Sequence, residues 1–97
     1  MTFTKKKNGN SLEIAVEGRL DTTTAPILET ELYRSLPGVT ELTFDFAKLK
    51  YISSAGLWLL LAVYKSMKGK GTMRVINVSD IIREVFEVTG FSSMLDV

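Results

Sequence analysis

The chain of 97 residues contains neither cysteine nor histidine, and these two absences exclude most of the common catalytic and metal-binding arrangements. Without cysteine there is no disulfide framework, no thiolate metal site and no cysteine nucleophile. Without histidine no Ser-His-Asp triad can form, so acid–base catalysis would depend on carboxylates, lysine or tyrosine. We therefore expect a protein that is not an enzyme and that holds no metal and no cofactor.

Long apolar runs and an excess of one charge are also missing. The longest apolar run, residues 57–64, is much shorter than the roughly 20 residues that span a bilayer. Residues 1–5 lack the apolar segment of a signal peptide. The net charge of +1 requires neither nucleic acid nor an anionic membrane as a partner. These features predict a soluble, cytoplasmic protein with no direct nucleic-acid contact and no membrane insertion.

The hydrophobic pattern that is present predicts alternating strands and helices. Hydrophobic residues make up 45% of the chain, enough for one small domain with a core. Four segments read as strands and three as helices, which gives the order ββαβαβα. Such alternation is typical of an α/β fold with a mixed, mostly parallel sheet of four to five strands and crossover helices. The predicted strands are residues 3–7, 12–16, 39–46 and 73–78, and the helices begin at Thr23 or Thr24, near Ser54, and at Ser79.

The chain is organised around residues 45–57, where a strand ends at Asp45, a short loop follows and a helix begins at two serines. We expect Ser54 to lie beside the unpaired N–H groups of the helix start. That position suits a side-chain cap, and it also suits a phosphate. Because binding surfaces gather at the carboxyl ends of parallel strands, we expect Asp21, after an earlier strand, to lie beside Ser54. Asp21 is either a turn residue or a partner contact.

Trp58 is the most informative aromatic residue. A tryptophan usually packs in the core, but successive helical residues rotate by about 100°, which places Trp58 beside the inward stripe and not on it. The inward stripe is predicted to contain Leu57, Leu60, Leu61, Tyr64 and Met67. We predict a partly exposed patch of Trp58, Leu59 and Ala62, and such a patch on a small domain indicates a partner.

Three segments resemble the STAS domain family. Residues 18–26, Gly-Arg-Leu-Asp-Thr-Thr-Thr-Ala-Pro, resemble its Gly-x-Leu-Asp…Thr-Ala-Pro element. Residues 45–57 are similar to its signature, an aspartate and a short loop followed by Asp-Ser-Ser-Gly-Leu or a variant. Residues 77–79 and 88–91 resemble its last strand–helix unit and its Thr-Gly-Leu ending. The segments follow in order over nearly the whole chain, so residues 1–97 are identified as a single STAS domain.

A free-standing STAS domain of this length most resembles bacterial anti-sigma factor antagonists. The resemblance implies that the dephosphorylated protein binds an anti-sigma factor that is also a serine kinase, which frees the sigma factor. Phosphorylation of the first serine of the signature, here Ser54, ends the binding, and a phosphatase resets it. Where many antagonists have aspartate this chain has Ser53, and Ala55 replaces the second serine. Ser53 is therefore an alternative acceptor, less favoured than Ser54. The predicted partner contacts are Asp21, Thr22, Ser53, Ala55, Gly56, Trp58, Leu59 and Ala62.

The sequence is compatible with two other functions. The resemblance also covers a STAS subunit that does not switch, such as the small cytoplasmic partner of a lipid-trafficking transporter complex. A carboxylate-based hydrolase is the enzyme that the composition leaves open, and it is disfavoured because only Asp21 and Asp45 lie at strand ends of the required kind. The phosphorylation-controlled antagonist is the preferred function.

Overall fold

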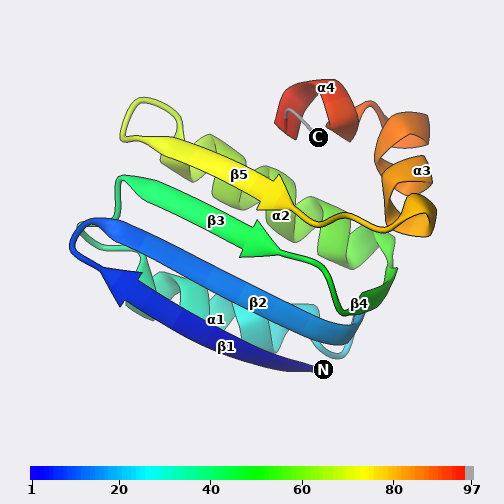
Figure 1. Ribbon diagram of the computed structural model, residues 1–97, viewed down its shortest axis with the longest axis horizontal. Coiled ribbons are helices and arrows are strands. Elements are labelled where there is room, and N and C mark those ends of the chain that lie inside the picture. The colour runs from blue at the N-terminus through cyan, green and yellow to red at the C-terminus, as the bar shows by residue number, and fades with distance from the viewer. Residues whose placement is uncertain (96–97) are drawn as a thin grey trace.

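A computed structural model describes residues 1–95 of the chain, and within them five strands form one mixed sheet (Figure 1). The order across the sheet is β1-β2-β3-β5, and β4 pairs with β2 beyond the end of β3. Strand β1 runs antiparallel to β2, and the other pairs are parallel, which confirms the predicted mixed, mostly parallel sheet. The strands are β1 (Thr2–Asn8), β2 (Ser11–Leu20), β3 (Glu41–Asp45), β4 (Leu49–Ile52) and β5 (Thr72–Ile76).

The helices follow the parallel strands, as predicted. They are α1 (Ala25–Ser35), α2 (Ser54–Met67), α3 (Asp80–Thr89) and a short α4 (Phe91–Leu95) that the sequence did not predict. The predicted cap of α3 is confirmed, because Ile82 N donates to Ser79 Oγ at 3.4 Å. Gly90 ends that helix in the left-handed conformation that favours glycine. No helix within residues 1–95 combines the length and the apolar character that a membrane crossing requires.

Alternation of apolar and polar residues along the strands decides which face of the sheet the helices cover. In β2 the side chains of Leu12, Ile14 and Val16 are buried, and the residues between them are partly exposed. Helices α1 and α2 lie side by side on that apolar face (Figure 1). Each fully buried Leu, Ile or Phe contributes ~1.5–3 kcal/mol, so the apolar face holds both helices. The largest fully buried side chains are Phe44, Phe46, Phe86, Ile14, Leu20, Leu28, Leu32, Leu42, Leu60, Ile82 and Val16.

Strand β4 and the second half of β2 differ from the prediction. Residues 49–52 were expected to be a loop, and β2 was expected to end at Val16, but β2 continues to Leu20 and pairs there with β4. The pairing shifts at a β-bulge between Gly18 and Arg19, where Gly18 has φ +91°. No strand signal marks β4 in the sequence, because Lys50 and Tyr51 stand together between Leu49 and Ile52 and the inward-facing residues do not alternate with outward-facing ones.

Candidate functional site

The two strand-to-helix junctions that the sequence singled out lie side by side. Because β2 and β4 are paired, Leu20 lies opposite Ile52 at the carboxyl ends of the two strands. The backbone N–H of Ser53 donates to the Leu20 carbonyl at 2.9 Å. This hydrogen bond holds the start of α2 next to the end of β2. The expected neighbourhood of Asp21 and the serine pair is therefore confirmed, although the strand that creates it was not predicted.

Ser54 is the first residue of α2, and it is exposed. The position expected for the cap is corrected by one residue, because the N-cap is Ser53, with extended backbone and no capping bond from its side chain. The first turn of α2 contains no acidic residue. The unpaired N–H groups of this helix start therefore have neither a cap from the Ser53 side chain nor an acidic residue within their own turn.

The two serines differ in access. The Oγ atom of Ser53 is buried and has no hydrogen-bond partner among residues 1–95. Ser54, one residue further, belongs to the exposed surface. A second protein that approaches this junction meets the side chain of Ser54 before that of Ser53.

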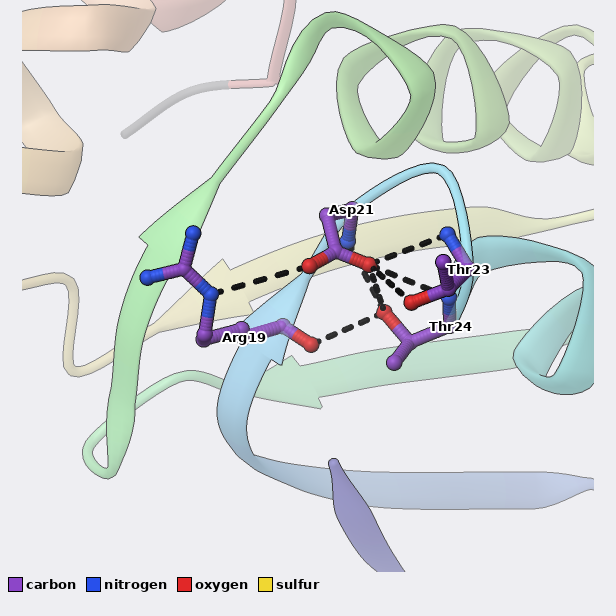
Figure 2. A network of polar contacts seen from close by, with 4 residues as sticks. All are labelled: Arg19, Asp21, Thr23 and Thr24. Carbon is purple, nitrogen blue, oxygen red and sulfur yellow. Dashed lines mark hydrogen bonds and ion pairs between the residues drawn. The ribbon is translucent and has the colours of Figure 1, made fainter.

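Asp21 organises the loop between β2 and α1 (Figure 2). Its Oδ1 accepts hydrogen bonds from the Thr23 N–H at 3.0 Å, the Thr23 hydroxyl at 2.8 Å and the Thr24 N–H at 3.2 Å. The Thr24 hydroxyl accepts from the Asp21 N–H at 2.8 Å and donates to the Arg19 carbonyl at 2.8 Å. The turn role that the sequence allowed for Asp21 is thus present in the structure, and its predicted contact with a partner stays a prediction.

These hydrogen bonds change the acidity of Asp21. The Thr23 hydroxyl, aided by the N–H groups of Thr23 and Thr24, lowers the pKa of Asp21 from 3.8 to about 2 against a smaller effect of desolvation. A lowered pKa in the folded state stabilises the fold above the unfolded value, and this stability is lost as the pH falls from about 4 towards 2. The loop should therefore keep its charge and geometry at neutral pH.

We expect Asp21→Asn to flatten the loss of stability between pH 4 and pH 2, because the amide can still accept hydrogen bonds but does not titrate there. Thr23→Val should raise the folded-state pKa of Asp21 by removing the strongest donor, so the loss of stability should be smaller and should end at a higher pH. Thr22→Val should leave the loss unchanged. Urea unfolding at a series of pH values measures all three. A wild-type slope in Asp21→Asn would contradict this assignment.

Arg19 and Tyr51 belong to the same site, and sequence reasoning missed them. The Arg19 guanidinium lies 4.2 Å from the centre of the Tyr51 ring, and its Nε is 3.6 Å from Asp21 Oδ2. Tyr51 lies on β4 opposite Arg19. Because the contact depends on the unpredicted pairing of β4 with β2, the sequence held no signal for it beyond the arginine two residues before Asp21.

The predicted apolar patch on α2 is confirmed in part. Trp58 is 68% exposed and Ala62 is exposed, as expected. Leu59 was expected to be exposed with them and is only 6% exposed, so that prediction is wrong. Leu59 turns inward because α1 packs beside α2, which widens the buried face of α2 to include Leu59 and Val63. Leu61 and Tyr64, predicted in the inward stripe, are only partly buried.

Gly56 is buried, and its role is packing. A methyl group on Gly56 would lie 2.7 Å from Ile52 Cγ1 and 3.0 Å from the Leu20 carbonyl oxygen. The missing side chain therefore allows α2 to begin close against the ends of β2 and β4. Gly56 was predicted to contact the partner, but it presents no side chain to a surface.

The remaining predicted contacts line a groove between the starts of α1 and α2. Thr22 is exposed and Ala55 is partly exposed, and both border a groove of about 490 Å³ together with Trp58 and Leu59.

Asp45, the other carboxylate at a strand end, accepts from the Ala47 N–H at 3.0 Å and from Asn77 Nδ2 at 3.1 Å. Both junction carboxylates therefore hold loops in place. The site therefore displays the Ser54 hydroxyl at the start of α2, next to the groove bordered by Ala55 and Trp58.

Comparisons with known proteins agree with this fold. A family model described as the STAS domain matches residues 2–97. The putative anti-sigma factor antagonist BtrV of Bordetella bronchiseptica is 33% identical over 99 residues, which cover 100% of this chain and 85% of BtrV. The anti-sigma-B factor antagonist of Bacillus subtilis is 25% identical over 93 residues, covering 95% and 85%.

A solved structure shows the same arrangement of elements. The anti-sigma factor antagonist SpoIIAA in its unphosphorylated form has a TM-score of 0.86 at 21% identity, covering 95% of this chain and 84% of SpoIIAA. Its phosphorylated form has a TM-score of 0.77 at the same identity, covering 95% and 86%. At this level of identity the likeness shows the fold.

Proposed function

The chain belongs to the STAS domain family, and we propose that it is an anti-sigma factor antagonist controlled by phosphorylation of Ser54. Relatives of similar length are anti-sigma factor antagonists. The observation that carries the proposal is the exposed Ser54 at the first turn of α2, at the edge of the sheet where β2 and β4 end. The unphosphorylated protein would bind an anti-sigma factor in the cytoplasm and release its sigma factor.

The anti-sigma factor would also act as the kinase. The Ser54 hydroxyl oxygen attacks the γ-phosphorus of ATP held by that partner, the bond to the β–γ bridging oxygen breaks, ADP leaves, and the hydroxyl proton passes to a base of the kinase. A phosphatase returns the serine by hydrolysis of the phosphate ester. Ser53 is a poorer acceptor because its hydroxyl oxygen is buried.

A phosphate on Ser54 should change the binding of a partner without destabilising the fold. A phosphate adds a charge of about −1.5 to −2, and a helix N-terminus favours such a charge. No acidic residue in the first turn of α2 opposes it. The fold therefore tolerates the phosphate, whereas a partner packed on the same surface would meet a new, desolvated charge. The switch would act at the interface and not by unfolding.

Incubation with the cognate anti-sigma factor kinase and ATP, followed by mass spectrometric mapping, tests the acceptor. We expect one phosphate on Ser54, none in Ser54→Ala, and normal incorporation in Ser53→Ala. Phosphate on Ser53, or no incorporation by a kinase that phosphorylates another antagonist in the same assay, would overturn the assignment of Ser54.

A further inference from the structure

The groove beside Ser54 shares Glu29, Leu59 and Ala62 with a second hollow further along α1 and α2, and the two together are treated as one groove. Both helices follow parallel strands, so both begin at the same edge of the sheet and run side by side (Figure 1). The groove starts between Pro26 and Ala55 and passes Glu29 and Ala62 to reach Ser66. From Ala55 to Ser66 a helix rises about 16 Å, or three turns.

The walls of this groove have the spacing and chemistry of a helix-docking surface. On α2 the lining residues Ala55, Leu59, Ala62 and Ser66 recur every three or four positions, and three of them are small. The rim carries two large aromatic side chains, Trp58, which is 68% exposed, and Tyr33, which is 73% exposed. An amphipathic helix buries its apolar face in a groove of this kind.

One charged residue lies on the wall between these apolar positions. Glu29 borders both parts of the groove and is exposed. No lysine or arginine within residues 1–95 forms an ion pair with it, since the three ion pairs there involve Glu31, Asp21 and Glu17. An occupant that covered Glu29 with apolar groups alone would bury an unpaired carboxylate at a high cost. The occupant must therefore bring a cation.

We propose that the groove receives a three-turn amphipathic helix of the anti-sigma factor, with an arginine or lysine on its apolar face that pairs with Glu29. This inference rests on the proposed function and specifies the part of the partner that binds. The docked helix runs antiparallel to α1 and α2, because its negative C-terminal end then lies beside the positive N-terminal ends of both. Phosphate on Ser54 would face that negative end, which explains why it would repel the helix.

Affinity measurements by calorimetry with the cognate anti-sigma factor test the groove. Glu29→Lys and Ala62→Arg should each weaken binding at least tenfold, the first by charge reversal and the second by filling the groove. Glu84→Lys, on the exposed surface of α3, and Thr4→Arg, on the edge strand, are matched controls that should change the affinity less than twofold. Far-ultraviolet circular dichroism checks the fold, and Glu29→Gln, with the same shape as glutamate, replaces Glu29→Lys should the latter misfold.

A photo-crosslinking amino acid at position 62 identifies the occupant. We expect the crosslink on a helix of the anti-sigma factor that carries a basic residue; a crosslink to a strand, to a loop or to a second copy of this chain would overturn the inference. Normal affinity of Glu29→Lys and Ala62→Arg, together with phosphorylation of Ser54, would also overturn it and leave the proposed function standing. Failure of the native chain to bind any anti-sigma factor would remove both.

Discussion

Replacing Ser54 by aspartate is expected to weaken binding to the anti-sigma factor by about 100-fold, while the protein stays folded. Ser54 lies on the exposed first turn of α2, beside the groove bordered by Ala55 and Trp58. A carboxylate at position 54 would be buried against a partner surface that binds a neutral serine and offers no cation to pair with it. An uncompensated buried charge costs about 3 kcal/mol or more. Each 1.4 kcal/mol corresponds to a factor of ten in affinity. Titration calorimetry with the purified partner measures the change.

Stability should respond differently from binding. A negative charge in the first turn of a helix stabilises it by about 0.3–1 kcal/mol, so Ser54→Asp should unfold at the same or slightly higher urea concentration. Asn10→Asp adds the same charge in the exposed turn between β1 and β2, outside any helix, and should change neither property. Ser54→Ala should bind as the native chain does. Equal affinity of Ser54→Asp and the native protein would instead identify a STAS subunit that does not switch, such as a partner in a lipid-trafficking transporter complex.

Replacing Gly71 by alanine is expected to destabilise the fold by about 3 kcal/mol, near the upper end of the cost of overpacking. Gly71 joins α2 to β5, and a methyl group there would overlap the carbonyl group of Thr40. That carbonyl cannot move freely, because it accepts a hydrogen bond from the Thr72 N–H at 2.8 Å. Relief of the overlap would therefore separate the start of β5 from the chain that leads into β3.

The matched control is Gly69→Ala, two residues earlier in the same turn. A methyl at Gly69 meets no atom within 4 Å, but the residue has φ +83°, so alanine there should cost only about 1–2 kcal/mol for the left-handed backbone. Urea unfolding compares the two variants. A smaller loss in the free energy of unfolding for Gly71→Ala than for Gly69→Ala would contradict this prediction. It would show that the turn shifts enough to relieve the overlap with Thr40.

The site shows where sequence reasoning succeeded and where it failed. Ser54 was predicted at the start of a helix because polar residues that follow an apolar strand and precede a helical stripe fix that boundary locally. The cap itself moved to Ser53, since side-chain patterns place a helix end only to within a residue or two. The neighbourhood of Asp21 and Ser54 followed from a general rule about the carboxyl ends of parallel strands.

Contacts between distant segments were the main failures. Leu59 was assigned to the exposed patch because a helical wheel contains no information about neighbouring elements. The burial of Leu59 depends on α1 packing beside α2. The contact of Arg19 with Tyr51 depends on β4, which is too short and too irregular to predict. The place of Glu29 on the groove wall could not be predicted, because two helices that are separate in the sequence form that groove together.

The sequence by itself determined the order of β1, β2, β3, β5 and helices α1 to α3, the apolar faces of β2 and β3, and the identity of the exposed serine. These features depend on residues near one another in the chain. It also determined the family, through three motifs in order. Only the tertiary structure decided that β2 pairs with two strands in succession, that the Ser53 oxygen is buried, and that α1 and α2 leave a groove between them. The physical reason is that burial and pairing belong to the surfaces that two segments make together, which neither segment encodes alone.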